Sequence, residues 1–182
     1  MFPSGYTKYI KACKNNGHSP DISLARYATR YKMAGQLESI KLLDHSETSQ
    51  KLYLHAFRIS LAYSALESLE EYLLDKLAIK DIKIANLVRK SSAKTRVFFL
   101  TQANKKLRNS LQKFFESANN SDLKPFCTAL RHSMFHGQFN PSASGLNNAS
   151  GLSLLFLVET ALFEAINKAS ESEFRKLMEK YK

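Results

Sequence analysis

The sequence predicts an all-α protein, an antiparallel up-and-down helical bundle of about five to seven helices. Apolar residues recur every three to five positions in each long segment, and no segment shows the residue-by-residue alternation of a half-buried strand. The chain has 182 residues, of which 44% are hydrophobic and 24% charged, a composition typical of chains that fold around a core. We therefore expect residues 1–182 to form one helical domain.

The first half of the chain contains one clear long helix. Residues 1–20 hold two glycines and two prolines, which indicates a loosely ordered lead-in. Asp21 offers an N-cap for a first helix over residues 24–43. Residues 47–77 contain no glycine or proline and carry a regular apolar stripe, so they predict one long amphipathic helix.

Shorter helices follow in the second half. Asp81 can cap a helix through Leu87, and Ser91 and Ser92 can start another that ends at Gln102. A further helix begins at Asn104 and ends at the turn over residues 119–121.

The next helix is predicted to begin at Ser121 and to end near His136. Pro125 is tolerated in its first turn, and Gly137 is well placed directly after its last turn. Residues 138–151 predict a loop, after which Ser150 starts a final helix toward Lys182.

Several phenylalanines could stack on nucleic-acid bases, but their helical spacing favours burial in the core. These residues are Phe98, Phe99, Phe114, Phe115 and Phe156.

Positive charge is concentrated in one part of the chain. The net charge is +11, and residues 76–113 contain eleven Lys and Arg against one acid, Asp81. Such a segment is either a solvated face or a surface that contacts nucleic-acid phosphates. For the second alternative we predict the contacts Arg89, Lys90, Lys94, Arg96, Lys105, Lys106 and Arg108.

Other classes of protein lose their usual support. The two cysteines, Cys13 and Cys127, lie far apart and outside any zinc-ligand spacing, which favours reduced thiols in a cytoplasmic protein without a metal or other cofactor. The N-terminus does not resemble a signal peptide, and no apolar run predicts a membrane span. Motifs of the Walker, Rossmann, HExxH and GxSxG types are also absent from the sequence.

One short segment, ALRHSMFHGQFNP, carries residues suited to chemistry. Four residues separate Arg131 from His136, and the polar His132 follows the arginine. The segment resembles the HEPN superfamily (higher eukaryotes and prokaryotes nucleotide-binding), whose all-helical domains carry an arginine, a polar residue, and a histidine after four to six positions. The family's usual LRN…HG reads LRHSMFHG here, with His132 in place of the commoner asparagine. The likeness covers residues 120–145 in detail and the helix order elsewhere.

The resemblance implies a metal-independent endoribonuclease, often a homodimer whose two motifs share a cleft, with a role as a toxin or antiviral effector. A neutralising protein such as a nucleotidyltransferase is an expected partner in such systems. The implied reaction is attack of a ribose 2′-OH on the adjacent phosphate of RNA, which leaves a 2′,3′-cyclic phosphate.

This reaction needs a base, an acid and a cation beside the phosphate. We assign proton transfer to His136, phosphate binding to Arg131, and orientation or the second proton transfer to His132. The end of a helix suits His136 as the acid. On an ideal helix Arg131 and His136 lie about 140° apart, so convergence needs unwinding at His136, a long reach by Arg131, or a second subunit.

Two other interpretations remain open. His136 and Gly137 can simply end a helix while Arg131 forms a surface ion pair, in which case the domain is a non-catalytic module that binds nucleic acid or a protein. His132 and His136 also have the i, i+4 spacing of a zinc pair, but no third ligand lies nearby in the sequence.

Overall fold

The computed structural model describes residues 2–19 and 21–179, and its regular structure in these ranges is helical. Apart from one isolated bridge between Lys80 and Asp122, no β-structure is present in them, so the predicted all-α class is confirmed. The described residues form eight helices instead of the five to seven predicted. They are α1 (Tyr6–Asn15), α2 (Ile22–Gln36), α3 (Glu47–Leu73), α4 (Ile82–Arg89), α5 (Ala93–Gln102), α6 (Lys105–Glu116), α7 (Lys124–Phe135) and α8 (Ala149–Glu179).

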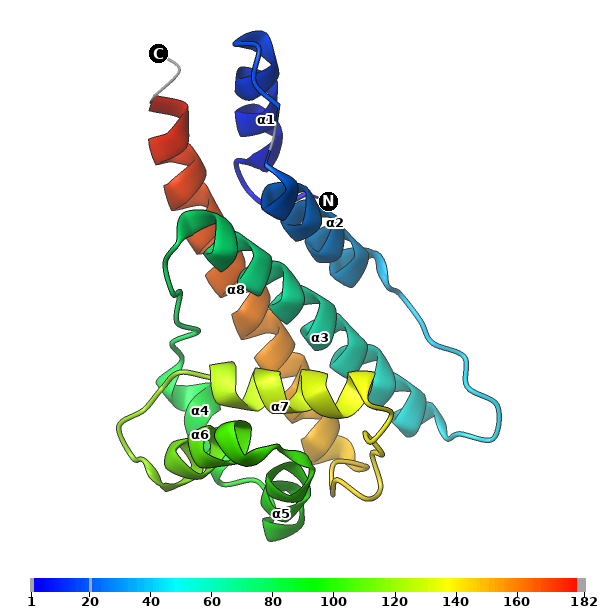
Figure 1. Ribbon diagram of the computed structural model, residues 1–182. Coiled ribbons are helices and arrows are strands. Elements are labelled where there is room, and N and C mark those ends of the chain that lie inside the picture. The colour runs from blue at the N-terminus through cyan, green and yellow to red at the C-terminus, as the bar shows by residue number, and fades with distance from the viewer. Residues whose placement is uncertain (1, 20, 180–182) are drawn as a thin grey trace.

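The long helices α3 and α8 form the axis of the bundle (Figure 1). Helix α2 packs antiparallel to α3, whereas α3 and α8 run in the same general direction (Figure 1). The arrangement therefore departs from a simple up-and-down order. The four shorter helices α4 to α7 lie between α3 and α8 in sequence, and they gather at the end of the molecule where α8 begins (Figure 1).

The prediction of a loosely ordered lead-in was wrong, because α1 occupies half of it. Tyr6, Tyr9 and Cys13 follow helical spacing, and Tyr9 and Cys13 are buried. The rings of Tyr6 and Tyr9 contact Phe174 of α8, with centroid distances of 5.9 and 5.3 Å. This apolar stripe outweighs the glycines and prolines, which lie outside the helix. Met1 and Pro20 lie outside the described residues.

Three predicted boundaries also differ. The helix predicted over residues 24–43 ends at Gln36, and residues 37–43 are non-helical. Helix α3 ends at Leu73 instead of Leu77: Leu74 adopts a left-handed conformation with φ 54°, and the Leu77 N–H donates to the Glu70 carboxylate at 2.7 Å. Ser121 does not cap α7, which starts at Lys124 after Leu123.

The predicted N-caps Asp21, Asp81 and Ser92 are confirmed, as is the predicted helix start at Asn104. Side-chain oxygens of Asp21, Asp81, Ser92 and Asn104 accept hydrogen bonds from backbone N–H groups in the first turns of α2, α4, α5 and α6. Helix α8 begins one residue before the predicted Ser150, and residues 180–182 of the predicted helix lie outside the described residues. Local capping chemistry therefore sets most helix starts.

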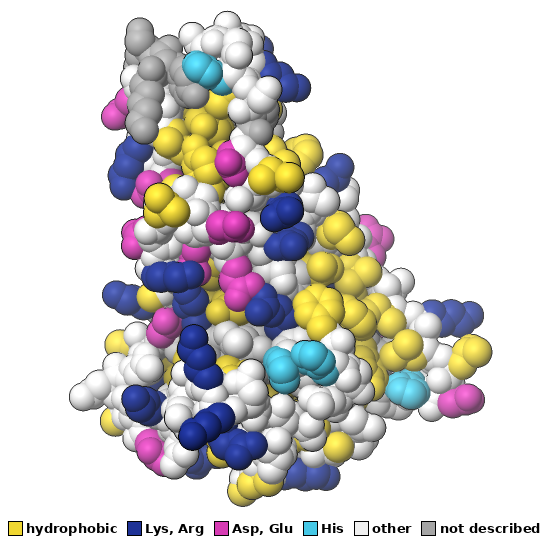
Figure 2. Space-filling view, viewed as in Figure 1, with side chains coloured by type: hydrophobic (Ala, Val, Ile, Leu, Met, Phe, Trp, Pro, Cys, Tyr) yellow, Lys and Arg dark blue, Asp and Glu magenta, His cyan; other side chains and the backbone are white. Residues whose placement is uncertain are grey.

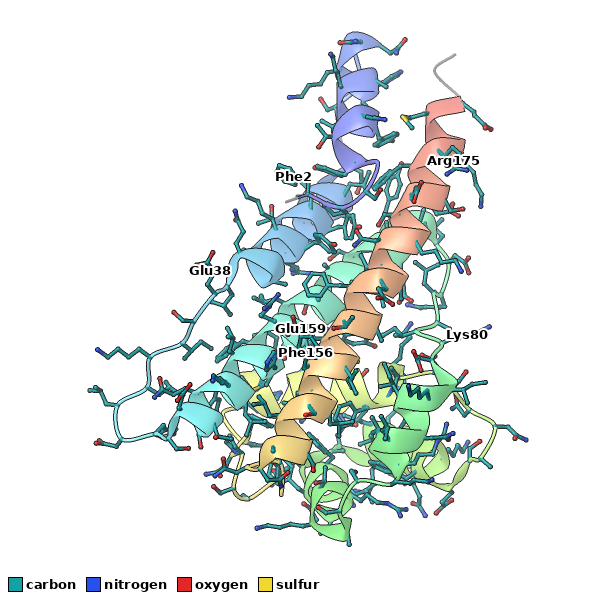
Figure 3. The ribbon with its side chains drawn as sticks, turned by 180° about the vertical axis from the view of Figure 1, so that it is seen from behind. Phe2, Glu38, Lys80, Phe156, Glu159 and Arg175 are labelled. Atoms are coloured by element: carbon teal, nitrogen blue, oxygen red, sulfur yellow. The ribbon has the colours of Figure 1, made fainter. Side chains whose placement is uncertain are left out.

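Four of the five phenylalanines predicted in the core are buried, namely Phe98, Phe99, Phe114 and Phe115. The prediction was wrong for Phe156, which is 54% exposed. Its ring meets the His55 ring edge-on at 5.8 Å, while the neighbouring Glu159 is buried between α8 and α3 (Figure 3). Glu159 binds His55 Nδ1 at 2.7 Å and Arg58 Nη2 at 3.0 Å, so polar contacts lie beside Phe156, where the sequence predicts apolar packing.

Helix α8 is long and apolar enough to cross a membrane, judged by length and composition alone. The central helix of a water-soluble bundle meets the same criterion, and 44% of its most apolar stretch is buried inside the protein. Leu155, Val158 and Leu162 of this helix are fully buried. Its apolar character therefore agrees with a core position, and this feature alone is weak support for a membrane span.

Candidate functional site

Helix α7 carries the Arg/His motif and packs against α3 and α6. Phe126, Cys127 and Leu130 are buried in the core, so α7 is anchored along one side. Burial raises the pKa of the Cys127 thiol, which disfavours the reactive thiolate. Pro125 occupies the first turn, as predicted. The opposite side of α7 is left to form a surface.

The C-terminus of α7 has the predicted form. His136 is the C-cap residue, with φ −90° and ψ 7°, and its N–H donates to the His132 carbonyl at 3.1 Å. Gly137 has φ 67°, a left-handed conformation that glycine adopts without steric cost. The Ser133 carbonyl then accepts hydrogen bonds from the N–H groups of Gln138 and Phe139. The chain therefore leaves the helix abruptly after His136.

Arg131, His132 and His136 all line one groove, with a volume of about 680 Å³, between α6 and α7. Lys106 of α6 and Lys124 of α7 line it as well. The rings of His132 and His136 are adjacent, with centroids 4.3 Å apart, and two neighbouring histidines are visible at the surface beside Lys and Arg side chains (Figure 2). One chain thus brings the three motif residues to one groove, despite the offset of about 140° on an ideal helix.

Arg131 is held by two residues of α3. Its Nη1 donates to a carboxylate oxygen of Glu67, and its guanidinium lies over the Tyr63 ring at 5.3 Å from the centroid. Burial lowers the pKa of Arg131, the Tyr63 hydroxyl raises it, and the neighbouring Arg30 lowers it again. The guanidinium remains a cation, and Glu67 balances its charge.

The surroundings of His132 favour its neutral form. Burial lowers the pKa of His132, and the nearby His136 and Arg131 lower it further. Neither imidazole donates to or accepts from another side chain within residues 2–19 and 21–179. A neutral imidazole with a free nitrogen can accept a proton, so His132 is suited to act as a base.

The predicted nucleic-acid contacts fall into two groups. Lys90, Lys94, Lys105 and Lys106 are exposed, and Lys106 also lines the groove. The three arginines, by contrast, contact their own protein.

Arg89 donates to the Phe114 carbonyl at 3.1 Å and lies over the Phe114 ring. Arg96 lies over the Phe115 ring at 5.2 Å. Arg108 donates to the carbonyl of Leu100 at 2.9 Å. These arginines fix α4, α5 and α6 to one another, although each retains its charge.

Sequence reasoning missed three residues at this site, Glu67, Tyr63 and Lys124. Lys124 was detectable as a basic residue two turns before the motif on the same helix. Glu67 and Tyr63 gave no signal, because they reach Arg131 only when α3 packs against α7.

A metal-based mechanism gains no support from side-chain clusters. No group of three or more His, Cys, Asp or Glu that could hold a metal ion occurs within the described ranges.

Comparison of the chain with known protein families, with curated proteins and with solved structures finds no match.

Proposed function

We propose that this protein is an HEPN-like, metal-independent endoribonuclease that acts in the groove between α6 and α7. The observation that carries the proposal is the meeting of Arg131, His132 and His136 in one groove. Lys106 and Lys124 add positive charge to the same groove, which favours a polyanionic ligand.

The proposed reaction uses only side chains of the groove. Neutral His132 accepts the proton of the ribose 2′-OH, whose oxygen attacks the adjacent phosphorus. His136 donates a proton to the departing 5′-oxygen, and Arg131 binds the non-bridging phosphate oxygens as negative charge builds up. The P–O5′ bond breaks as the O2′–P bond forms, which leaves a 2′,3′-cyclic phosphate and a 5′-hydroxyl.

The biological setting of the proposal is a cytoplasmic toxin or antiviral effector. A homodimer would bring two grooves together, and the 59% exposed Phe135 beside His136 supplies apolar surface where such a contact would form. Hydrophobic side chains gather next to the histidine pair (Figure 2). A neutralising protein, for example a nucleotidyltransferase, would cover the same face.

The test compares wild type with Arg131→Ala, His136→Ala and the control His45→Ala in EDTA, on single-stranded and structured RNA. His45 is an exposed histidine outside the groove. Wild type and His45→Ala should leave 2′,3′-cyclic phosphate ends, while the two groove variants should lose at least about 100-fold in rate. Equal cleavage by all four proteins would show a contaminating nuclease and refute the site.

A second candidate is a helical module that binds nucleic acid without cutting it. The ion pair between Arg131 and Glu67 favours this alternative, because it gives Arg131 a structural role. RNA binding by all four proteins with no cleavage by any of them would select it.

A further inference from the structure

The cation of Arg131 already has a partner, because Glu67 of α3 binds it. We propose that Glu67 masks Arg131: its carboxylate and a phosphodiester of the bound ligand compete for the same guanidinium. Glu67 thereby sets how tightly the groove binds phosphodiester chains. The inference rests on the proposed function only in taking the groove as the ligand site.

The ion pair lies where a ligand can reach it. The side chains of Arg131 and Glu67 are 25% and 38% exposed, so a displaced Glu67 carboxylate can turn into water without becoming a buried, unpaired charge. Glu70, one turn further along α3, differs in this respect because its side chain is 1% exposed. Glu67 is therefore the exchangeable carboxylate on this part of α3, and Glu70 the fixed one.

The geometry favours exchange of partners over movement of the arginine. The Tyr63 ring lies against the guanidinium, and the Thr128 hydroxyl donates to the Tyr63 hydroxyl at 2.8 Å. These contacts hold the guanidinium plane after Glu67 leaves. Because Glu67 accepts from Nη1, it competes with a phosphate that binds both η nitrogens.

The decisive measurement is affinity for a ligand that cannot be cleaved. A fluorescent 2′-O-methyl oligouridylate lacks the attacking hydroxyl, so its binding can be followed by fluorescence anisotropy whether or not the protein is a nuclease. Glu67→Gln should lower the Kd about five-fold, the effect of freeing one partly exposed charged donor. Glu67→Ala should give the same direction of change.

Glu71→Gln is the matched control. Glu71 lies one turn along the same helix, is exposed, and has no ion pair in the described part of the chain. It removes the same negative charge, so any general effect of net charge appears in both variants. We expect less than a two-fold change in Kd for Glu71→Gln.

The gain should also depend on Arg131. In an Arg131→Ala background, Glu67→Gln should change the Kd no more than Glu71→Gln does. A Glu67→Gln protein that binds no more tightly than Glu71→Gln, or that keeps its gain without Arg131, overturns the proposal. If Glu67 only stabilised the fold, Glu67→Gln would instead lower both the melting temperature and the affinity. Absence of RNA cleavage by wild type would refute the proposed function and leave this binding result standing.

Discussion

Replacement of Glu70 by glutamine is expected to destabilise the protein markedly. Its carboxylate is almost fully buried and accepts from Lys124 Nζ at 2.5 Å and from the Leu77 N–H at 2.7 Å. Lys76 Nζ approaches at 3.4 Å, but that side chain is 83% exposed. Glu70 therefore fixes the segment after α3 to the start of α7, where Lys124 lines the groove.

The expected loss in the free energy of unfolding follows from Lys124 and the Leu77 N–H, the two partners that remain in the variant. Breaking a buried ion pair costs about 3–5 kcal/mol. Lys124 keeps some access to water, at 18% exposure, and a glutamine oxygen still accepts from the Leu77 N–H, so we expect a loss of about 2–3 kcal/mol. For a chain of this length each kcal/mol lowers the Tm by about 2–4 °C, which gives a drop of about 4–12 °C.

Urea denaturation followed by far-UV circular dichroism measures this loss. Lys76→Ala is the control: it removes the exposed partner of the same carboxylate, and its effect should stay below about 0.5 kcal/mol. If Glu70→Gln unfolds at the same urea concentration as Lys76→Ala, the carboxylate does not stabilise this junction and the reasoning is wrong.

Three further predictions concern the motif and the basic segment. Gly137→Ala should cost about 1 kcal/mol in chemical denaturation, because φ is 67° and a Cβ there meets no other atom within 4 Å; an unchanged stability would contradict it. The pKa of His132 is lowered from 6.5, and it should rise in His136→Ala when followed by NMR titration. Because this pKa is lower in the folded protein, the stability linked to neutral His132 is fully present above pH 6.5. That stability is lost as the pH falls through the pKa of His132 in the folded protein. Arg89→Ala should lower the Tm, whereas Lys90→Ala should lower only RNA affinity, and the reverse result would exclude this division.

Local chemistry made much of the fold predictable. Short-range hydrogen bonds and backbone conformation determine where several helices begin or end, and neighbouring residues in the sequence indicate both. Examples are the helix starts at Asp81, Ser92 and Asn104 and the glycine after α7. The same rules failed where packing decided the outcome. Leu74 ends α3 in a conformation unusual for leucine, because Glu70 holds the chain that follows.

The candidate site divides in the same way. The motif on α7 was visible because its three residues are close in sequence. Glu67 is 64 residues away from Arg131 along the chain, and no local pattern marks an acid that will meet an arginine of another helix. The ion pair depends on how α3 and α7 pack, which periodicity alone does not determine.

The division between lysines and arginines in the basic segment limits what that segment can recognise. Arg89 and Arg108 donate guanidinium N–H groups to backbone carbonyls. These donors are therefore not available for the bidentate hydrogen bonds by which arginine recognises base edges. The exposed lysines carry charge on flexible stems, and such groups bind phosphates with little regard to sequence. Affinity from this surface should therefore be general and salt-dependent. If the ligand is RNA, we expect any preference among sequences to arise in the groove that Arg131 and the two histidines line.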